Sequence, residues 1–203
     1  IKHLLTEIKQ GKQVALSNIL LRLDNELRDR YKFSETKMYR KFPKQGGLIE
    51  HENNMAISTE EKEELFKLAE KCVENFYNSN ILKEIKALGV DKWLSLEEFI
   101  SFDFEGNKIS LSMDFVVKNG ENKIIIYDWK TGKVRDTEIG MQLACYALYA
   151  IQKWGFNPGN IIVKRYHLAI DKEDEFFVDA GIIEQIKEHI RTSINEMKAL
   201  LSD

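Results

Sequence analysis

The sequence predicts a mixed α/β protein with a helical N-terminal half, and three features of its hydrophobic pattern support this fold class. Apolar residues recur at the three- and four-residue spacing of amphipathic helices in residues 3–28 and 58–88. Beyond Trp93, short runs of β-forming residues are separated by turn signals. Helical patterns return at 136–154 and 180–201, so a mixed central sheet flanked by helices is expected.

The N-terminal half is expected to contain several helices. Residues 3–28 form the first helical pattern, and Gly11 is placed to divide it in two. Residues 35–54 are polar and irregular. Ser58 and the acidic residues after it indicate a helix start, because a serine caps free N–H groups and acids favour the positive end of the helix dipole. A short helix over 81–88 is expected to end at the following glycine.

The C-terminal half is expected to form the sheet. Strands are predicted over 96–104, 108–117, 124–130, 160–170 and 175–178, with turns at 105–107 and at Asn119-Gly120. We expect one domain spanning residues 1–203, with a mainly helical part at 1–92 and the sheet core at 93–203.

Composition bounds the classes of function. The net charge of −3 argues against a chain that coats nucleic acid non-specifically, although it leaves room for a local basic groove. Cys72 and Cys145 are far apart, which indicates two buried thiols of a cytoplasmic protein. No apolar run approaches the roughly 20 residues that span a bilayer, and no signal peptide is evident. Because Ile1 falls directly inside a helical pattern, we expect the chain to be part of a longer protein.

The most informative segment is 124–132, in which β-forming residues end in Asp128, a spacer and Lys130. Side chains alternate between the faces of a strand, so Asp128 and Lys130 share a face. Asp114 lies in the preceding apolar strand, where an acid is costly unless a partner or a metal compensates it. Because Mg²⁺ and Mn²⁺ prefer carboxylate oxygens, these residues predict one metal site on a β-hairpin. The alternative is a structural ion pair of Asp128 with Lys130.

The loop of this hairpin decides whether the two acids share a face. A two-residue loop at Asn119-Gly120 places Asp114 opposite Ile125, on the face away from Asp128. An odd loop, of three or five residues, is expected to place Asp114 opposite Ile126, diagonal to Asp128 and on its face. We therefore predict an odd loop or a bulge.

Gln142 and Tyr146 stand one helical turn apart in an apolar helix and therefore share a face. They are placed to reach a phosphate or Lys130. A satisfied pair in the core explains them equally well.

Three elements, in order along the chain, resemble the PD-(D/E)XK nuclease superfamily: Asp114, then Asp128-Trp129-Lys130-Thr131-Gly132, then Gln142 with Tyr146. The closer resemblance is to the RecB-like exonuclease branch, which includes the nuclease domains of RecB and AddB. It implies a restriction-endonuclease-like fold. The iron–sulfur cysteines of some relatives are absent, which places this chain among the cluster-free members.

The resemblance implies Mg²⁺- or Mn²⁺-dependent hydrolysis of DNA phosphodiester bonds, leaving a 5′-phosphate. Asp114 and Asp128 hold the metal, Lys130 supports the attacking water, and Gln142 and Tyr146 position the phosphate or Lys130. The expected setting is DNA repair, recombination, or phage or defence processing, with a helicase or another protein as a possible partner. The alternative is a non-catalytic nucleic-acid-binding or docking module of a larger helicase–nuclease complex.

Further ligands follow from the same resemblance. The branch carries an upstream histidine on a helix as an additional metal ligand, and His3 resembles it, although the glycine that usually precedes this histidine lies outside the chain. A lone histidine on a helix is otherwise solvated or structural. Glu97 or Glu98 is a further acidic candidate. Only one of these neighbours can face the site, and the sequence leaves open which.

The remaining features have structural interpretations beside functional ones. Residues 37–44 mix basic and aromatic residues as single-strand binders do, but a solvated loop is the favoured interpretation. Glu50-His51 is interpreted as a polar loop pair in preference to a contact with metal or DNA. His167 is expected to be a packed or edge histidine, and Trp129 to point into the core.

Overall fold

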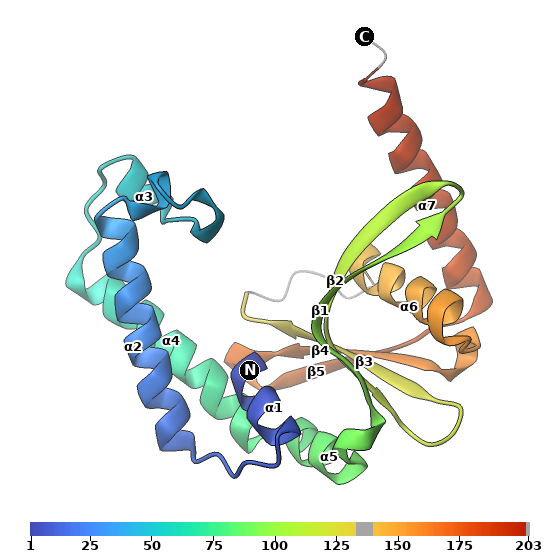
Figure 1. Cartoon of the computed structure of the whole chain (residues 1–203), viewed down its shortest axis with the longest axis horizontal. Coiled ribbons are helices and arrows are strands. Elements are labelled where there is room, and N and C mark those ends of the chain that lie inside the picture. Colours follow the sequence, from blue (N-terminus) through green and yellow to red (C-terminus); the bar gives the residue numbers. More distant parts are fainter. Residues whose placement is uncertain (133–139, 202–203) are drawn as a thin grey trace. The chain divides into compact units, whose positions relative to one another are not determined.

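The computed structural model describes residues 1–132 and 140–201, and the chain divides into two compact units (Figure 1). Unit 1 consists of Ile1, His3–Ser79 and Leu168–Ile170. Unit 2 consists of Lys2, Asn80–His167 and Asp171–Asp203. The first unit is helical and the second contains the sheet, whereas one domain spanning 1–203 stays a prediction.

Unit 1 is built around two 20-residue helices, α2 and α4, which pack against each other. The predicted division at Gly11 is confirmed, because this residue lies between the first two helices and has a φ of +74°. The predicted start at Ser58 is also confirmed, since its hydroxyl accepts from the Glu61 N–H in a capping box. The elements of this unit are α1 (Lys2–Lys9), α2 (Leu16–Glu35), η1 (Met38–Arg40), η2 (Pro43–Gln45), α3 (Ile49–Glu52), α4 (Thr59–Asn78) and η5 (Leu168–Ile170).

Unit 2 is a mixed sheet with helices on it, as predicted. The five strands follow the order β1-β2-β3-β4-β5, and every neighbouring pair is antiparallel except β3 and β4. A parallel pair needs a crossover connection, which α6 provides. The elements are α5 (Asn80–Leu88), η3 (Val90–Lys92), β1 (Trp93–Phe104), β2 (Asn107–Lys118), β3 (Ile124–Lys130), α6 (Met141–Trp154), η4 (Pro158–Asn160), β4 (Ile161–His167), β5 (Lys172–Phe177) and α7 (Ala180–Ala199).

The strand predicted over 160–170 ends at His167, because residues 168–170 form the 3₁₀ turn η5, which belongs to unit 1. The helix predicted over 136–154 is seen from Met141, and residues 136–139 lie outside the described residues.

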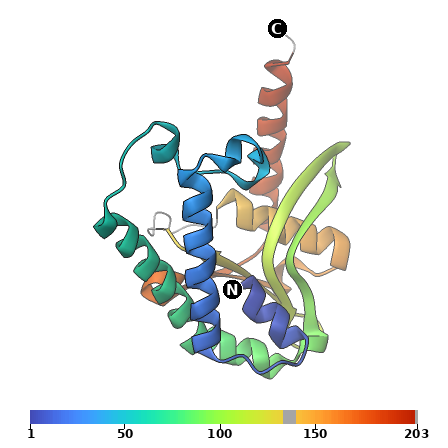
Figure 2. The same ribbon diagram turned by 60° about the vertical axis from the view of Figure 1, so that its left-hand side comes forward.

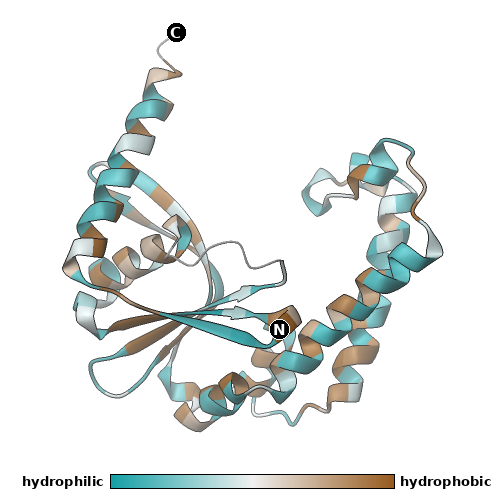
Figure 3. Cartoon of the chain, turned by 180° about the vertical axis from the view of Figure 1, so that it is seen from behind, coloured by the Kyte–Doolittle hydropathy of each residue, from teal (hydrophilic) through white to brown (hydrophobic). Residues whose placement is uncertain are grey.

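The core of unit 2 lies between one face of the sheet and helices α6 and α7. The β1–β2 hairpin curves alongside these helices (Figure 2), and Arg191 of α7 donates to Glu105 in its turn at 2.7 Å. Hydrophobic and hydrophilic residues alternate along α7 in Figure 3, as expected of a helix that buries one side. The core residues of the central strands and of α6 include Val116, Ile124, Ile126, Leu143, Tyr146, Ala147, Ile161 and Val163.

Two predictions from composition concern the cysteines and membrane-spanning helices. Cys72 is buried, as expected, whereas Cys145 is only partly buried. Within the described ranges, no helix combines the length and apolar character that crossing a membrane requires.

Candidate active site on strands β2 and β3

The β2–β3 hairpin brings Asp114 and Asp128 to the same face of the sheet. Its loop has five residues, 119–123, because Lys118 pairs with Ile124, and the Asn119 N–H closes the loop on the Lys123 carbonyl at 2.8 Å. The prediction of an odd loop is therefore confirmed.

The expected partner of Asp114, Ile126, was wrong by two residues. The ladder runs to the pair Phe115 and Tyr127, so the next pair in the same register is Asp114 with Asp128, directly opposite rather than diagonal. A three-residue loop is needed to bring Asp114 level with Ile126. The regular pairing ends at Phe115 and Tyr127, and both acids lie on the same face of the hairpin beyond it.

Asp128 is a buried carboxylate beside a cation. Its side chain is 1% exposed, and the Lys130 Nζ lies 2.9 Å from its Oδ2. Burial raises the pKa of Asp128, and the Lys130 ammonium opposes that rise. A buried acid at the end of an apolar strand is destabilising by itself, so its retention here points to a chemical use.

Asp114 is partly buried and bonded across to β3. Its Oδ2 accepts from the Trp129 N–H at 2.7 Å, which holds the carboxylate at the end of the hairpin ladder. The pKa of Asp114 is raised to about 6, mainly by burial and also by the negative charges of Asp128 and Glu97, while that hydrogen bond lowers it. A bound cation would relieve the effect of these two neighbouring acids on Asp114.

A hydrogen-bonded chain from α6 holds Lys130. The Lys130 ammonium donates to Gln142 Oε1 at 3.0 Å, and Gln142 Nε2 donates to the Tyr146 hydroxyl at 2.6 Å. The Tyr146 hydroxyl in turn donates to the Ser112 carbonyl of β2. Burial raises the pKa of Tyr146, so its hydroxyl stays protonated as a donor. Of the two targets predicted for this pair, phosphate or lysine, the structure shows a contact with the lysine.

The two acidic candidates on β1 differ in their surroundings. Leu96 pairs with Phe115 and Glu98 pairs with Met113, which leaves Glu97 level with Asp114. Glu97 has a left-handed backbone, with φ of +48°, which is uncommon outside glycine and is found at functional positions. Its carboxylate lies 3.8 Å from the Lys2 ammonium.

Glu98 makes a different contact. Its Oε2 accepts from the Ser95 hydroxyl of the same strand at 3.4 Å. Its charge is also absent from the causes that shift the pKa of Asp114, whereas the charge of Glu97 is among them. The geometry therefore favours Glu97 as the acidic neighbour.

Arg165 lies beside Asp128, a position that was not predicted from the sequence. In the parallel ladder Asp128 pairs with Arg165, so their side chains share a face. Arg165 is 6% exposed, and its charge acts with Lys130 against the raised pKa of Asp128. The signal was a basic residue two positions after Val163 in the alternation of a buried strand.

His167 is buried, as expected of a packed histidine. It pairs with Lys130 in the parallel ladder, and its Nε2 lies 2.8 Å from Asp174 Oδ2 of β5. Trp129, expected in the core, is only partly buried, and its ring stacks on Tyr127 with the centroids 5.3 Å apart.

The remaining candidates lie in unit 1. His3 is an exposed residue of α1, so its role as a metal ligand stays a prediction. Glu50 and His51 were expected to form a polar loop pair, but both lie on helix α3. His51 is buried there, and its Nδ1 lies 2.8 Å from the Ser34 hydroxyl. Among residues 1–132 and 140–201, no three His, Cys, Asp or Glu side chains form a group arranged to hold a metal ion.

Comparison with known proteins agrees with this geometry. A family model of the PD-(D/E)XK nuclease superfamily matches residues 21–201, which includes every strand of the sheet and the whole of α6. The search of curated proteins gives no match. On the extent of the family match, the chain belongs to the PD-(D/E)XK nuclease superfamily.

Proposed function

We propose that this protein hydrolyses DNA phosphodiester bonds with Mg²⁺ or Mn²⁺. The observation that carries the proposal is the joint placement of Asp114, Asp128 and Lys130, with the Lys130 ammonium 2.9 Å from Asp128 and on the same strand face. The site lies at the C-terminal end of β3, where β3 runs parallel to β4, and the ends of parallel strands commonly hold ligands.

The donor set suits a hard divalent cation. Asp114 and Asp128 offer carboxylate oxygens, and Glu97 adds a third acid close enough to affect the pKa of Asp114. His3 is proposed as a further ligand on the family resemblance alone. When bound, the ion supplies charge stabilisation at the phosphate and lowers the pKa of an attacking water.

Lys130 is proposed as the group that orients the attacking water and stabilises charge in the transition state. Its side chain is 38% exposed, so the ammonium can contact a bound substrate while it stays in contact with Asp128. Gln142 and Tyr146 are proposed as positioning residues, because the chain from Lys130 to the Ser112 carbonyl fixes the amine relative to β2.

Within the superfamily we propose the RecB-like exonuclease branch, without an iron–sulfur cluster. The support is the order Asp114, Asp128-x-Lys130 and Gln142-x-x-x-Tyr146 along the chain. A role in DNA repair, recombination, or phage or defence processing follows from that branch and is part of the same proposal.

The activity is tested by incubating the chain with labelled single- and double-stranded DNA in Mg²⁺, Mn²⁺ or EDTA. We expect cleavage with either metal, none in EDTA, and products that carry a 5′-phosphate. No metal-dependent cleavage of either substrate contradicts the proposal.

A second candidate function is a non-catalytic DNA-binding or docking module of a helicase–nuclease complex. The observation that favours it is the absence, among the described residues, of a complete group of three metal-ligating side chains. Binding of DNA without cleavage, at every metal concentration, supports this candidate over the first.

Tyr146→Phe tests the positioning chain. The substitution removes the hydroxyl that links Gln142 to the Ser112 carbonyl, so we expect kcat to fall about tenfold with little change in KM. Tyr149→Phe on the same helix makes the identical chemical change away from this chain and should leave kcat unaltered. Equal rates for both variants contradict the role given to Tyr146.

Glu97→Gln tests the acidic neighbour. Removing its charge should weaken Mn²⁺ binding about tenfold, measured by calorimetry on the protein alone and again as the half-saturating metal concentration for cleavage. Glu98→Gln is the matched control, because its carboxylate contacts Ser95 instead. A larger effect at Glu98 than at Glu97 reverses the assignment.

A further inference from the structure

Unit 1 contains an apolar pocket of about 430 Å³ between α2, α4 and residues 45–48. This volume lies in the range of small-molecule sites. Its walls are mainly apolar and aromatic, from Leu27, Tyr31, Phe33, Leu65 and Phe66. The pocket lies entirely within one compact unit.

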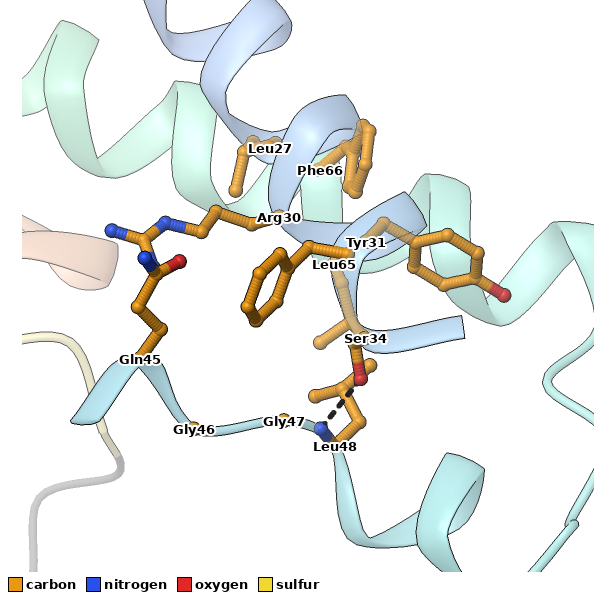
Figure 4. A pocket seen from close by; sticks show the side chains of 11 residues that line it. Leu27, Arg30, Tyr31, Ser34, Gln45, Gly46, Gly47, Leu48, Leu65 and Phe66 are labelled. Carbon is orange, nitrogen blue, oxygen red and sulfur yellow. Dashed lines mark hydrogen bonds between the residues drawn. The ribbon is translucent and has the colours of Figure 1, made fainter. Parts of the chain in front are cut away.

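The pocket is held open by polar contacts behind its wall. The buried Ser34 hydroxyl accepts from the Leu48 N–H at 2.7 Å (Figure 4). The buried His51 ring lies 2.8 Å from the same oxygen. Gly47 lets the chain pass under a ring, because a Cβ there would lie 2.2 Å from Tyr39 Cδ1. The wall is therefore preformed and does not need a ligand to shape it.

The mouth of the pocket carries two polar side chains with hydrogen-bonding capacity to spare. Figure 4 shows Arg30 and Gln45 side by side at one edge. Among the residues that the structure describes, neither the ion pairs nor the side-chain hydrogen bonds that are found involve Arg30 or Gln45. Arg30 is the only charged residue among those lining the pocket.

The segment that contributes to the mouth is rich in basic residues. Residues 30–48 contain six Lys or Arg and one acid, in a chain whose net charge is −3. Arg40 forms an ion pair with Glu52 at 2.8 Å, and the Lys37 ammonium donates to Asn54 at 2.7 Å. Lys41 and Lys44 are exposed. The exposed Phe42 ring lies 6.5 Å from Phe33 of the pocket wall, centroid to centroid.

We propose that this pocket binds a nucleobase of single-stranded DNA, with Phe33 as the stacking surface, Arg30 and Gln45 at the base edge, and Lys41 and Lys44 on flanking phosphates. An aromatic wall, unused polar groups at the rim and a basic surround are together the features by which single strands are held. The inference rests on the proposed function in naming DNA, and it adds that the substrate has an unpaired base.

The test is fluorescence anisotropy in EDTA, so that binding is measured without cleavage. Two labelled probes of equal length are compared: oligothymidylate, and a strand of abasic sites that keeps the phosphates and lacks the bases. We expect the wild-type chain to bind oligothymidylate about tenfold more tightly, because one base stacks on an aromatic ring. Phe33→Leu should remove this preference while leaving the affinity for the abasic strand unchanged.

Two exposed basic residues on α2, one in the pocket lining and one outside it, distinguish binding in the pocket from general electrostatic attraction of DNA. Arg30→Gln should reduce the preference for bases, whereas Lys32→Gln, outside the pocket lining, should weaken both probes slightly and equally. Equal affinity of the wild type for both probes overturns the proposal, as does a preference that survives Phe33→Leu and Arg30→Gln. Failure here leaves metal-dependent cleavage intact, while failure of the cleavage assay leaves the binding preference intact.

Discussion

Lys130→Ala is expected to reduce the rate of DNA cleavage about 10²–10³-fold, the usual effect of removing one preorganised donor from a transition state. In the described part of the site, only the Lys130 ammonium contacts both the Asp128 carboxylate and Gln142, which continues the hydrogen bonds to Tyr146. The loss should appear in kcat under single-turnover conditions at saturating metal and DNA. Binding of DNA in EDTA should change little, because one charge among many phosphate contacts is removed.

The control for this variant is Lys123→Ala, which removes an exposed lysine from the loop of the same hairpin. It should cleave at the wild-type rate. Cleavage by Lys130→Ala at a rate similar to that of Lys123→Ala contradicts a catalytic role for Lys130. Circular dichroism of both variants establishes that each is folded.

Asp114→Asn is expected to abolish cleavage and to stabilise the metal-free protein. The pKa of Asp114 is raised to about 6 in the fold from an ordinary value of 3.8. A carboxyl group whose pKa is higher in the folded than in the unfolded protein stabilises the fold fully only at a pH below its unfolded pKa. This contribution is lost as the pH rises through the folded pKa of about 6. At pH 7.5 the ionised carboxylate therefore destabilises the protein, by about 1–2 kcal/mol after allowance for its partial exposure.

The measurement is the thermal midpoint in EDTA at pH 7.5 and pH 4. Asp114→Asn should melt about 4 °C above the wild type at pH 7.5, and the difference should shrink as the pH falls. Added Mn²⁺ should stabilise the wild type and have little effect on the variant, because binding to the folded state is what raises the midpoint. A variant less stable than the wild type at pH 7.5 in EDTA contradicts the electrostatic account of Asp114.

Much of this site follows from the sequence because strand alternation is a strict constraint. The shared face of Asp128 and Lys130 required only that residues 124–130 form a strand. The odd loop followed from requiring Asp114 to face Asp128, and the five-residue loop satisfies it. The two-residue error in the partner of Asp114 arose because three- and five-residue loops give the same face but different registers.

Other features depend on contacts between segments that no local pattern encodes. Arg165 lies beside Asp128 only because β4 pairs in parallel with β3, and this pairing cannot be deduced from the sequence alone. The choice between Glu97 and Glu98 depends on a left-handed residue inside β1, a conformation that glutamate rarely adopts and that its sequence neighbours do not predict. The pocket on α2 depends on the Ser34 hydrogen bond to Leu48, fourteen positions along the chain.

The central claim is that the carboxylates of β2 and β3 support metal-dependent cleavage, and the most direct measurement compares Asp128→Asn with Asp103→Asn. Both variants replace a strand aspartate by its neutral isostere, but Asp103 is exposed and accepts from the Gly106 N–H in a turn. With saturating Mn²⁺ and labelled DNA, we expect Asp103→Asn to cleave at the wild-type rate and Asp128→Asn to retain no more than about 1% of it. Cleavage by a folded Asp128→Asn protein at the rate of Asp103→Asn would contradict the account.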